Sequence, residues 1–253
     1  MDLYEPAKVV AKEEESVIAR MSTMPFSEYS DEFLKALAVV LRTRMHSYEE
    51  TEKTKQEVTQ SYLEYTKRIQ EAVKATEGEI ITYEKRIIYP PYHFVSAAKT
   101  RGSADSFSTD RIPYLESVDS LSDQESEDYC HTYFFSIEDV AERIQSKRKK
   151  ADSEAAVVGN IKIKKRDEGN YVQLMEIDSL EITGDQFREF FDLPSSCFEL
   201  FCKENEMRIV TYGVGHGLGM SLYGAQRMAE MGNDYKKILC HYYPKTEIQV
   251  LSE

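Results

Sequence analysis

The stretch of sequence that decides the fold reads Gly213-Val214-Gly215-His216-Gly217-Leu218-Gly219-Met220-Ser221-Leu222-Tyr223-Gly224-Ala225. Glycines alternate with other residues up to Met220, and one residue between them is a histidine. Each glycine permits a backbone angle that other residues avoid, or lets another group approach closely. The run therefore predicts a tight loop that brings its own backbone and the imidazole of His216 to a cleft.

The residues after the glycine run have the spacing of helices. Ser221 is a suitable N-cap, apolar residues recur on one face up to Met231, and Gly232 ends this helix. Asp234 opens a second helix that Pro244 ends. The run lacks the Lys-Ser/Thr of a phosphate-binding loop and follows no βαβ unit. A plain strand-to-helix turn is the alternative interpretation.

The segment 213–246 resembles the C-terminal signature of the SpoIID/LytB family, which contains stage II sporulation protein D and amidase enhancers. Its Gly-His-Gly-Leu-Gly-Met-Ser, Tyr-Gly-Ala and His-Tyr-Tyr-Pro-Lys-Thr elements carry the resemblance. Further matches lie upstream, at 31–43, 72–83, His93 with Ser96 and Thr100, 113–118 and 182–196. The resemblance implies an N-terminal extension over 1–16 and one SpoIID/LytB-like domain over 17–253.

The order of the expected elements indicates an α+β fold. Long helices and antiparallel hairpins occur without alternating βα units. We expect a long N-terminal helix from residue 31 to about residue 46 and hairpins over 80–95, 157–182 and 198–212. The remaining expectations are a helical segment over 47–78 and loops over 102–110 and 120–128.

The family resemblance implies a reaction. SpoIID proteins are lytic transglycosylases that cleave peptidoglycan glycan strands already stripped of their stem peptides. Their acid/base is a glutamate in a Glu-Met-Pro motif shortly before the long helix. A buried carboxylic acid with a raised pKa can protonate the leaving glycosidic oxygen and then take a proton back.

This chain departs from the family at the catalytic position. Met24-Pro25 matches the Met-Pro pair, but Thr23 stands where the family has its glutamate. A threonine hydroxyl is not an acid near neutral pH. The resemblance thus predicts a protein that binds glycan strands with its transglycosylase activity reduced or lost. The alternative is an active enzyme that uses Glu28, which follows the proline and lies outside the motif.

Other cleft positions also depart from the family pattern. Leu37 and Leu222 stand where the family usually has glutamine, and the family's Ser-x-Gly-Gly segment reads Ser96-Ala97-Ala98-Lys99. Polar groups have become apolar while structural groups remain, which suggests a cleft that has kept its shape. The cleft residues carried over from the motif positions are Arg42, His93, Ser96, Thr100, His216, Ser221 and Tyr223.

The cysteines do not predict a metal site. Some family members bind zinc through a histidine and cysteines near the His-x-x-Ser segment, but no cysteine of this chain lies near His93. Cys130-His131 lacks the Cys-x-x-Cys spacing of zinc sites, but this pair is the remaining candidate for metal ligands in the sequence. Cys197 and Cys202 are expected in the core. We therefore expect neither zinc nor another cofactor.

Charge restricts the partners. The formal net charge is −13, which argues against nucleic acid because its binding requires clustered basic residues. The resemblance implies a peptidoglycan glycan strand as the partner. A cell-wall amidase or another sporulation protein is an alternative partner, and a scaffold protein without glycan affinity is a third interpretation of the chain.

The family is extracytoplasmic and membrane-anchored. Residues 1–12 contain no apolar stretch of anchor length, so the location stays open.

Overall fold

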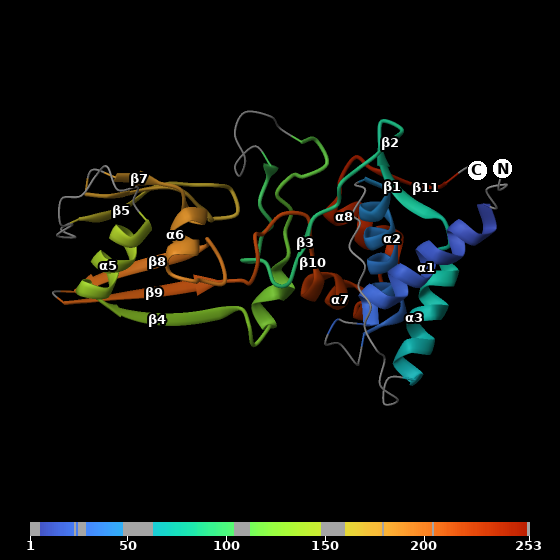
Figure 1. Ribbon diagram of the computed structural model, residues 1–253, viewed down its shortest axis with the longest axis horizontal. Coiled ribbons are helices and arrows are strands. Elements are labelled where there is room, and N and C mark those ends of the chain that lie inside the picture. The colour runs from blue at the N-terminus through green and yellow to red at the C-terminus, as the bar shows by residue number, and fades with distance from the viewer. Residues whose placement is uncertain are drawn as a thin grey trace. The chain divides into compact units, whose positions relative to one another are not determined.

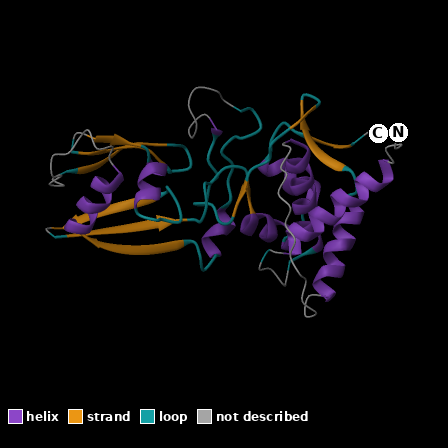
Figure 2. Cartoon of the chain, in the orientation of Figure 1, coloured by secondary structure: helices purple, strands orange, loops and turns teal. Residues whose placement is uncertain are grey.

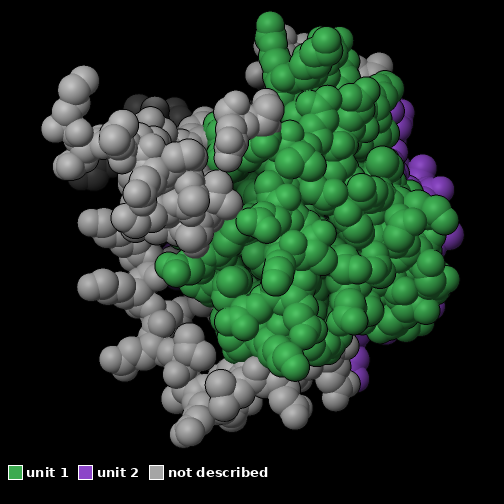
Figure 3. Space-filling view, turned by 90° about the vertical axis from the view of Figure 1, so that its right-hand side faces the viewer, with its two compact units in different colours: residues 1–91, 225–253 green, residues 92–224 purple. Residues whose placement is uncertain are grey.

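The computed structural model describes residues 6–22, 24, 29–47, 63–103, 112–147, 160–178, 180–203 and 205–251. The chain divides into two compact units, which Figure 3 distinguishes by colour. Unit 1 comprises residues 1–91 and 225–253, and unit 2 comprises residues 92–224. Helices and antiparallel strands both contribute (Figure 1, Figure 2), which confirms the α+β fold class.

Unit 1 is built around α2 (Asp31–Ser47), which is the predicted long helix. Every residue over 36–43 is buried, so this helix is surrounded by protein and has no solvent face there. The helices α1 (Pro6–Ser22), α3 (Leu63–Ala75) and α8 (Tyr235–Tyr242) contact it. Within the described ranges, no helix is both long and apolar enough to span a membrane.

A small antiparallel sheet completes unit 1. It has the order β11-β1-β2, formed by β11 (Glu247–Val250), β1 (Glu79–Tyr83) and β2 (Arg86–Ile87). Glu84 and Lys85 between β1 and β2 both have positive φ, which suits a two-residue hairpin turn. The Oγ1 of Thr43 in α2 accepts a hydrogen bond from the Ile81 N–H at 2.9 Å, which ties the sheet to the helix.

Unit 2 carries two three-stranded antiparallel sheets. The first has the order β4-β9-β8, formed by β4 (Cys130–Ser136), β9 (Glu206–Tyr212) and β8 (Phe198–Lys203). The second has the order β5-β6-β7, formed by β5 (Ile161–Arg166), β6 (Val172–Ile177) and β7 (Leu180–Ile182). Figure 1 shows α5 (Ile137–Lys147) and α6 (Gly184–Phe190) between the two sheets.

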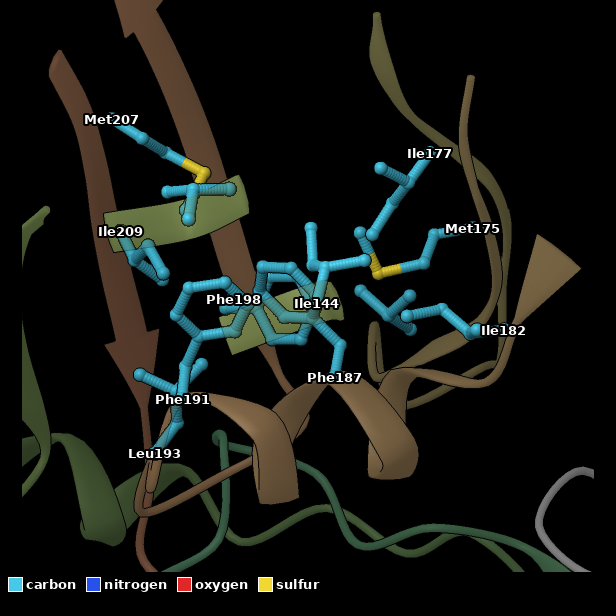
Figure 4. Close-up of a cluster of buried hydrophobic side chains, with 12 residues drawn as sticks. Ile144, Met175, Ile177, Ile182, Phe187, Phe191, Leu193, Phe198, Met207 and Ile209 are labelled. Atoms are coloured by element: carbon cyan, nitrogen blue, oxygen red, sulfur yellow. The ribbon is translucent and has the colours of Figure 1, made fainter. Parts of the chain in front are cut away.

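The two sheets and the two helices share one apolar core (Figure 4). The Thr183 side chain accepts from the Gln186 N–H and the Gln186 side chain accepts from the Thr183 N–H, and this capping box begins α6. The buried residues of the core are Val140, Ile144, Val172, Met175, Ile177, Ile182, Phe187, Phe191, Leu193, Phe198, Met207 and Ile209.

The rest of unit 2 contains β3 (Tyr92–His93), β10 (Met220–Ser221), the start of α7 (Leu222–Glu230) and the 3-10 helix η2 (Leu121–Glu125). The acidic segment expected as a loop over 120–128 therefore holds a helical turn. Most of the loop expected over 102–110, and residues 48–62 of the helical segment expected over 47–78, lie outside the described residues.

Candidate functional site

The glycine run is tied to the segment that carries His93. Val214 and Val95 exchange two main-chain hydrogen bonds, at 2.7 and 3.0 Å. β10 then pairs with β3 in parallel, which places Ser221 in register with His93. Ser221 also caps α7, because its Oγ accepts from the Gly224 N–H at 3.2 Å. The loop thereby joins the two sequence motifs that contain histidine.

The glycines of the run are required for close packing. Gly215 has a φ of +116°, and a Cβ at this position would lie 2.7 Å from the Cβ of His93. Gly217 has a φ of +81°, and a Cβ there would lie 2.6 Å from Cζ of Tyr171. The prediction that these glycines provide unusual backbone angles and close approach is confirmed.

His93 and His216 lie beside each other, with ring centroids 5.8 Å apart and an interplanar angle of 55°. The Nδ1 of His93 lies 3.1 Å from the Leu218 carbonyl oxygen, which can only accept, so Nδ1 carries the proton. Burial and, to a smaller extent, nearby His216 together lower the pKa of His93 to about 3. His93 is therefore neutral, and its buried Nε2 is an acceptor without a hydrogen-bond partner among the described residues.

His216 is held by its own loop. Its Nδ1 accepts a hydrogen bond from the Leu218 N–H at 3.0 Å. Leu218 thus contacts both imidazoles, through its carbonyl oxygen for His93 and through its N–H for His216. The orientation of the two rings is set by one backbone residue, which the glycine run holds in place.

Asp123 of η2 joins the two serines of the predicted cleft. One carboxylate oxygen accepts from the Ser221 hydroxyl at 2.9 Å, and the other accepts from the N–H of Ser96 at 2.9 Å and from its hydroxyl. Burial raises the pKa of Asp123, and the hydrogen bonds from Ser96 and Ser221 oppose this shift. Sequence analysis missed Asp123 because no motif or periodicity marks it in a segment rich in serine and acidic residues.

Thr100 and Tyr223 occupy the same unit and fix backbone. The Oγ1 of Thr100 accepts from the Val118 N–H at 2.9 Å, and the N–H of Tyr223 donates to the Phe94 carbonyl oxygen at 3.0 Å. Both residues hold segments that flank the histidines. The structure thus brings His93, Ser96, Thr100, His216, Ser221 and Tyr223 into unit 2.

Arg101 is a second residue that sequence analysis missed. It is 2% exposed, and its guanidinium donates to Asp167 at 3.1 Å and to Asp185 at 3.0 Å. It also lies over the ring of Tyr171, 5.2 Å from the centroid. Its N–H donates to the Gly217 carbonyl oxygen at 2.7 Å, so this charged cluster supports the glycine run. The residues of this charged cluster are far apart in sequence and share no motif.

Arg42 lies in unit 1 and has a partner of its own. Its Nε and Nη2 each donate to a carboxylate oxygen of Glu14 at 2.8 Å, and its Nη1 donates to the Glu79 carbonyl oxygen at 3.0 Å. Arg42 is 1% exposed. From the sequence, Glu13-Glu14-Glu15 is a charge run expected on a solvated helix face. For Glu14 this expectation is wrong, because its carboxylate is a fork partner of a buried guanidinium. A role for Arg42 in binding glycan stays a prediction.

Thr23 and Glu28 lie outside the described residues. The neighbouring Met24 is described, and its N–H donates to the Met21 carbonyl oxygen at 3.2 Å at the end of α1. The assignment of Thr23 to the catalytic position therefore rests on the sequence motif.

Within the described ranges, no three His, Cys, Asp or Glu side chains gather as a metal site would require. Cys130 and His131 are successive residues of β4, so their side chains point to opposite faces of the sheet. Cys197 is buried as expected, and burial raises the pKa of its thiol to about 12. The expectation of a core position is wrong for Cys202, which is exposed near the end of β8.

Known proteins resemble most of this chain. The family model described as "Stage II sporulation protein" matches residues 14–83. Stage II sporulation protein D of Bacillus amyloliquefaciens is 34% identical over 201 residues, which cover 79% of this chain and 56% of that protein. Its counterpart in Bacillus subtilis (strain 168) is 35% identical over 188 residues, which cover 74% and 53%.

A shorter match joins the chain to another Bacillus subtilis protein. The amidase enhancer of strain 168 is 56% identical over 36 residues, which cover 14% of this chain and 5% of that protein. The chain spans about half the length of the stage II sporulation proteins that it matches.

Proposed function

Because this chain belongs to the stage II sporulation protein D family, we propose that it binds peptidoglycan glycan strands and has reduced or lost lytic transglycosylase activity. In this role, residues 17–253, which span both units, act together as one functional domain. Its substrate lies outside the cytoplasmic membrane.

One observation carries the loss of activity: Thr23 precedes Met24-Pro25, where the resemblance calls for a glutamate. In the family reaction, the C6 hydroxyl of a muramyl residue attacks its own C1, the glycosidic bond breaks, and a 1,6-anhydro ring forms. The leaving oxygen needs a proton from the enzyme, and the attacking hydroxyl must lose one. A threonine can neither protonate the leaving oxygen nor take the proton of the attacking hydroxyl. Loss of such an acid/base lowers the rate by a factor on the order of 10²–10⁴.

His93 and His216 of unit 2 form a histidine cluster that supports retained binding. His216 is partly exposed beside the buried ring of His93, and sugar hydroxyl groups pair with imidazole nitrogens. Asp123 is not a suitable replacement for the missing acid. It is 0% exposed, and its carboxylate oxygens already accept hydrogen bonds from Ser96 and Ser221. This enclosed carboxylate is a poor proton donor to a glycan.

The alternative is an active transglycosylase in which Glu28 supplies the proton. Digestion of glycan strands freed of stem peptides distinguishes the two, with anhydromuramyl products detected by mass spectrometry. We expect no product from the wild type and product from Thr23→Glu. Thr23→Gln is the matched control, because it has a similar size and no acid. Product from the wild type, at a level that Thr23→Glu does not raise, would contradict the proposal, and Glu28→Gln would then test the alternative acid.

The match to an amidase enhancer favours a second role, in which the glycan-bound protein stimulates a cell-wall amidase. The test is the rate at which a purified cell-wall amidase releases stem peptides, with and without this protein. An unchanged rate at saturating protein would exclude this role and leave glycan binding unaffected.

A further inference from the structure

The sheet β4-β9-β8 of unit 2 has one face in the core and one face exposed. Met207 and Ile209 of β9 belong to the apolar core, and Tyr133, Phe135 and Leu200 pack against it. Because side chains alternate along a strand, the residues between them point away from the core. Figure 1 shows α5 and α6 on the side of the sheet that faces the core. The other side is called the outer sheet face below.

Three residues form one row across the outer sheet face. Phe134 of β4 and Phe201 of β8 are both register partners of Arg208 in β9. The two rings are 61% and 43% exposed, and both phenylalanines are among the few large apolar side chains that the described chain leaves in solvent. Neighbouring strands are about 4.8 Å apart, so the backbones of Phe134 and Phe201 lie about 10 Å apart. We call these residues the Phe-Arg-Phe row.

Arg208 brings a positive charge to this row. Its guanidinium lies over the ring of Phe201, 4.3 Å from the centroid. No ion pair between described residues involves Arg208, and alternation places Glu199 and Glu206 on the same face of the sheet. A guanidinium over a ring can still take a carboxylate at its edge through two parallel hydrogen bonds.

The chemistry of the row matches a glycan that carries carboxylates. Aromatic rings bind the C–H faces of pyranose rings, and two phenylalanines whose backbones lie about 10 Å apart suit sugars one disaccharide repeat apart. A peptidoglycan strand without stem peptides has a free lactyl carboxylate on every muramyl residue, hence one negative charge per disaccharide. That charge complements the cation between the two rings.

We propose that the outer sheet face is a binding surface for peptidoglycan glycan strands. Sugar rings contact the ring of Phe134 and the exposed part of Phe201 that Arg208 does not cover, and a muramyl carboxylate pairs with Arg208. This inference rests on the proposed function, and it adds a surface that is distinct from the histidine cluster and sensitive to the charge of the strand.

The test is binding of the full chain to three immobilised or titrated ligands. They are glycan strands freed of stem peptides, the same strands with carboxylates converted to methyl amides, and a neutral chitin oligosaccharide. We expect Phe134→Ala and Phe201→Ala to weaken binding of all three about tenfold each. Arg208→Gln should remove the preference for the charged strand and leave chitin binding unchanged.

Leu121→Ala is the matched control, because Leu121 is a large apolar side chain of unit 2 that is 65% exposed and lies off the sheet. Thermal unfolding of each variant checks that folding is retained. Wild-type binding that none of the row variants alters would overturn this inference and leave the proposed function standing. A wild type that binds no glycan would overturn both, and equal affinity for charged and amidated strands would overturn the role of Arg208.

Discussion

His93 is the residue at which burial and hydrogen bonding together select one protonation state. Its Nδ1–H donates to the Leu218 carbonyl oxygen, and its pKa falls to about 3. The imidazole is therefore neutral at any pH at which the protein is expected to work. A neutral histidine keeps one acceptor nitrogen, whereas a charged one carries protons on both ring nitrogens and can only donate.

Stability should fall in acid because of His93. Its folded pKa of about 3 lies below the ordinary value of 6.5, so its contribution is fully present above pH 6.5 and is lost as pH falls toward 3. From about pH 7 to about pH 4.5 this single group should lower the free energy of unfolding by roughly 3 kcal/mol. Urea denaturation measures the decrease.

His93→Asn is the informative variant for this prediction. Asparagine keeps a donor for the Leu218 carbonyl oxygen and does not titrate. Its free energy of unfolding should decrease less between the same two pH values, since only the other groups of the chain contribute. An equal decrease in wild type and variant would show that His93 is not the titrating group.

The Glu14–Arg42 pair gives a second prediction for single residues. Glu14→Gln leaves the Arg42 guanidinium buried without a counter-charge, which should cost roughly 3 kcal/mol. Glu15→Gln is the matched control, because Glu15 is an exposed neighbour on the same helix and should change stability by less than about 0.5 kcal/mol. Similar effects of the two changes in urea denaturation would refute the buried pair.

At the scale of elements, the glycine run determines where the histidines lie. Gly215→Ala would force a left-handed backbone angle and a methyl group 2.7 Å from the Cβ of His93. Gly232→Ala imposes a similar angle, with φ at +85°, but its Cβ would meet nothing within 4 Å. The difference between the two variants therefore isolates the close approach.

We expect Gly232→Ala to cost about 1 kcal/mol and Gly215→Ala at least about 2 kcal/mol more. Nuclear magnetic resonance of the histidine rings should also show His93 in a changed environment in Gly215→Ala alone. Equal losses of stability, with unchanged His93 signals in both variants, would mean that the run does not hold the histidine.

The sequence predicts those elements whose signal is local. The helix at 31–46, the hairpin that begins near residue 80 and the caps at Ser221 and Asp234 follow from periodicity and capping rules, and the structure confirms them. Tertiary partnerships carry no such signal. Asp123 between two serines, Arg101 with Asp167, and Glu14 on Arg42 all join residues distant in sequence.

The burial of individual cysteines is another feature that the sequence alone does not predict. Cys197 and Cys202 lie five residues apart in one apolar stretch, and only the first is buried. Cys202 lies near the exposed end of β8, where the strand leaves the core. Composition predicts that an apolar stretch is buried on average, but the exact place where a strand emerges depends on how the sheets pack.

At the scale of the whole molecule, the chain is an α+β member of the stage II sporulation protein D family. It spans about half the length of its stage II relatives. Its motifs for the long helix, the histidine segment and the glycine run persist, and Thr23 precedes Met24-Pro25. From these observations together we propose a glycan-binding protein whose cleft has lost proton transfer.

The measurement that tests this account most directly is the yield of anhydromuramyl product from glycan strands treated with wild type and with Thr23→Glu. The account predicts no product from the wild type and product at least about 100-fold above that background from Thr23→Glu, since one carboxyl group restores the missing step. Product from the wild type, at a level that Thr23→Glu does not raise, would contradict it.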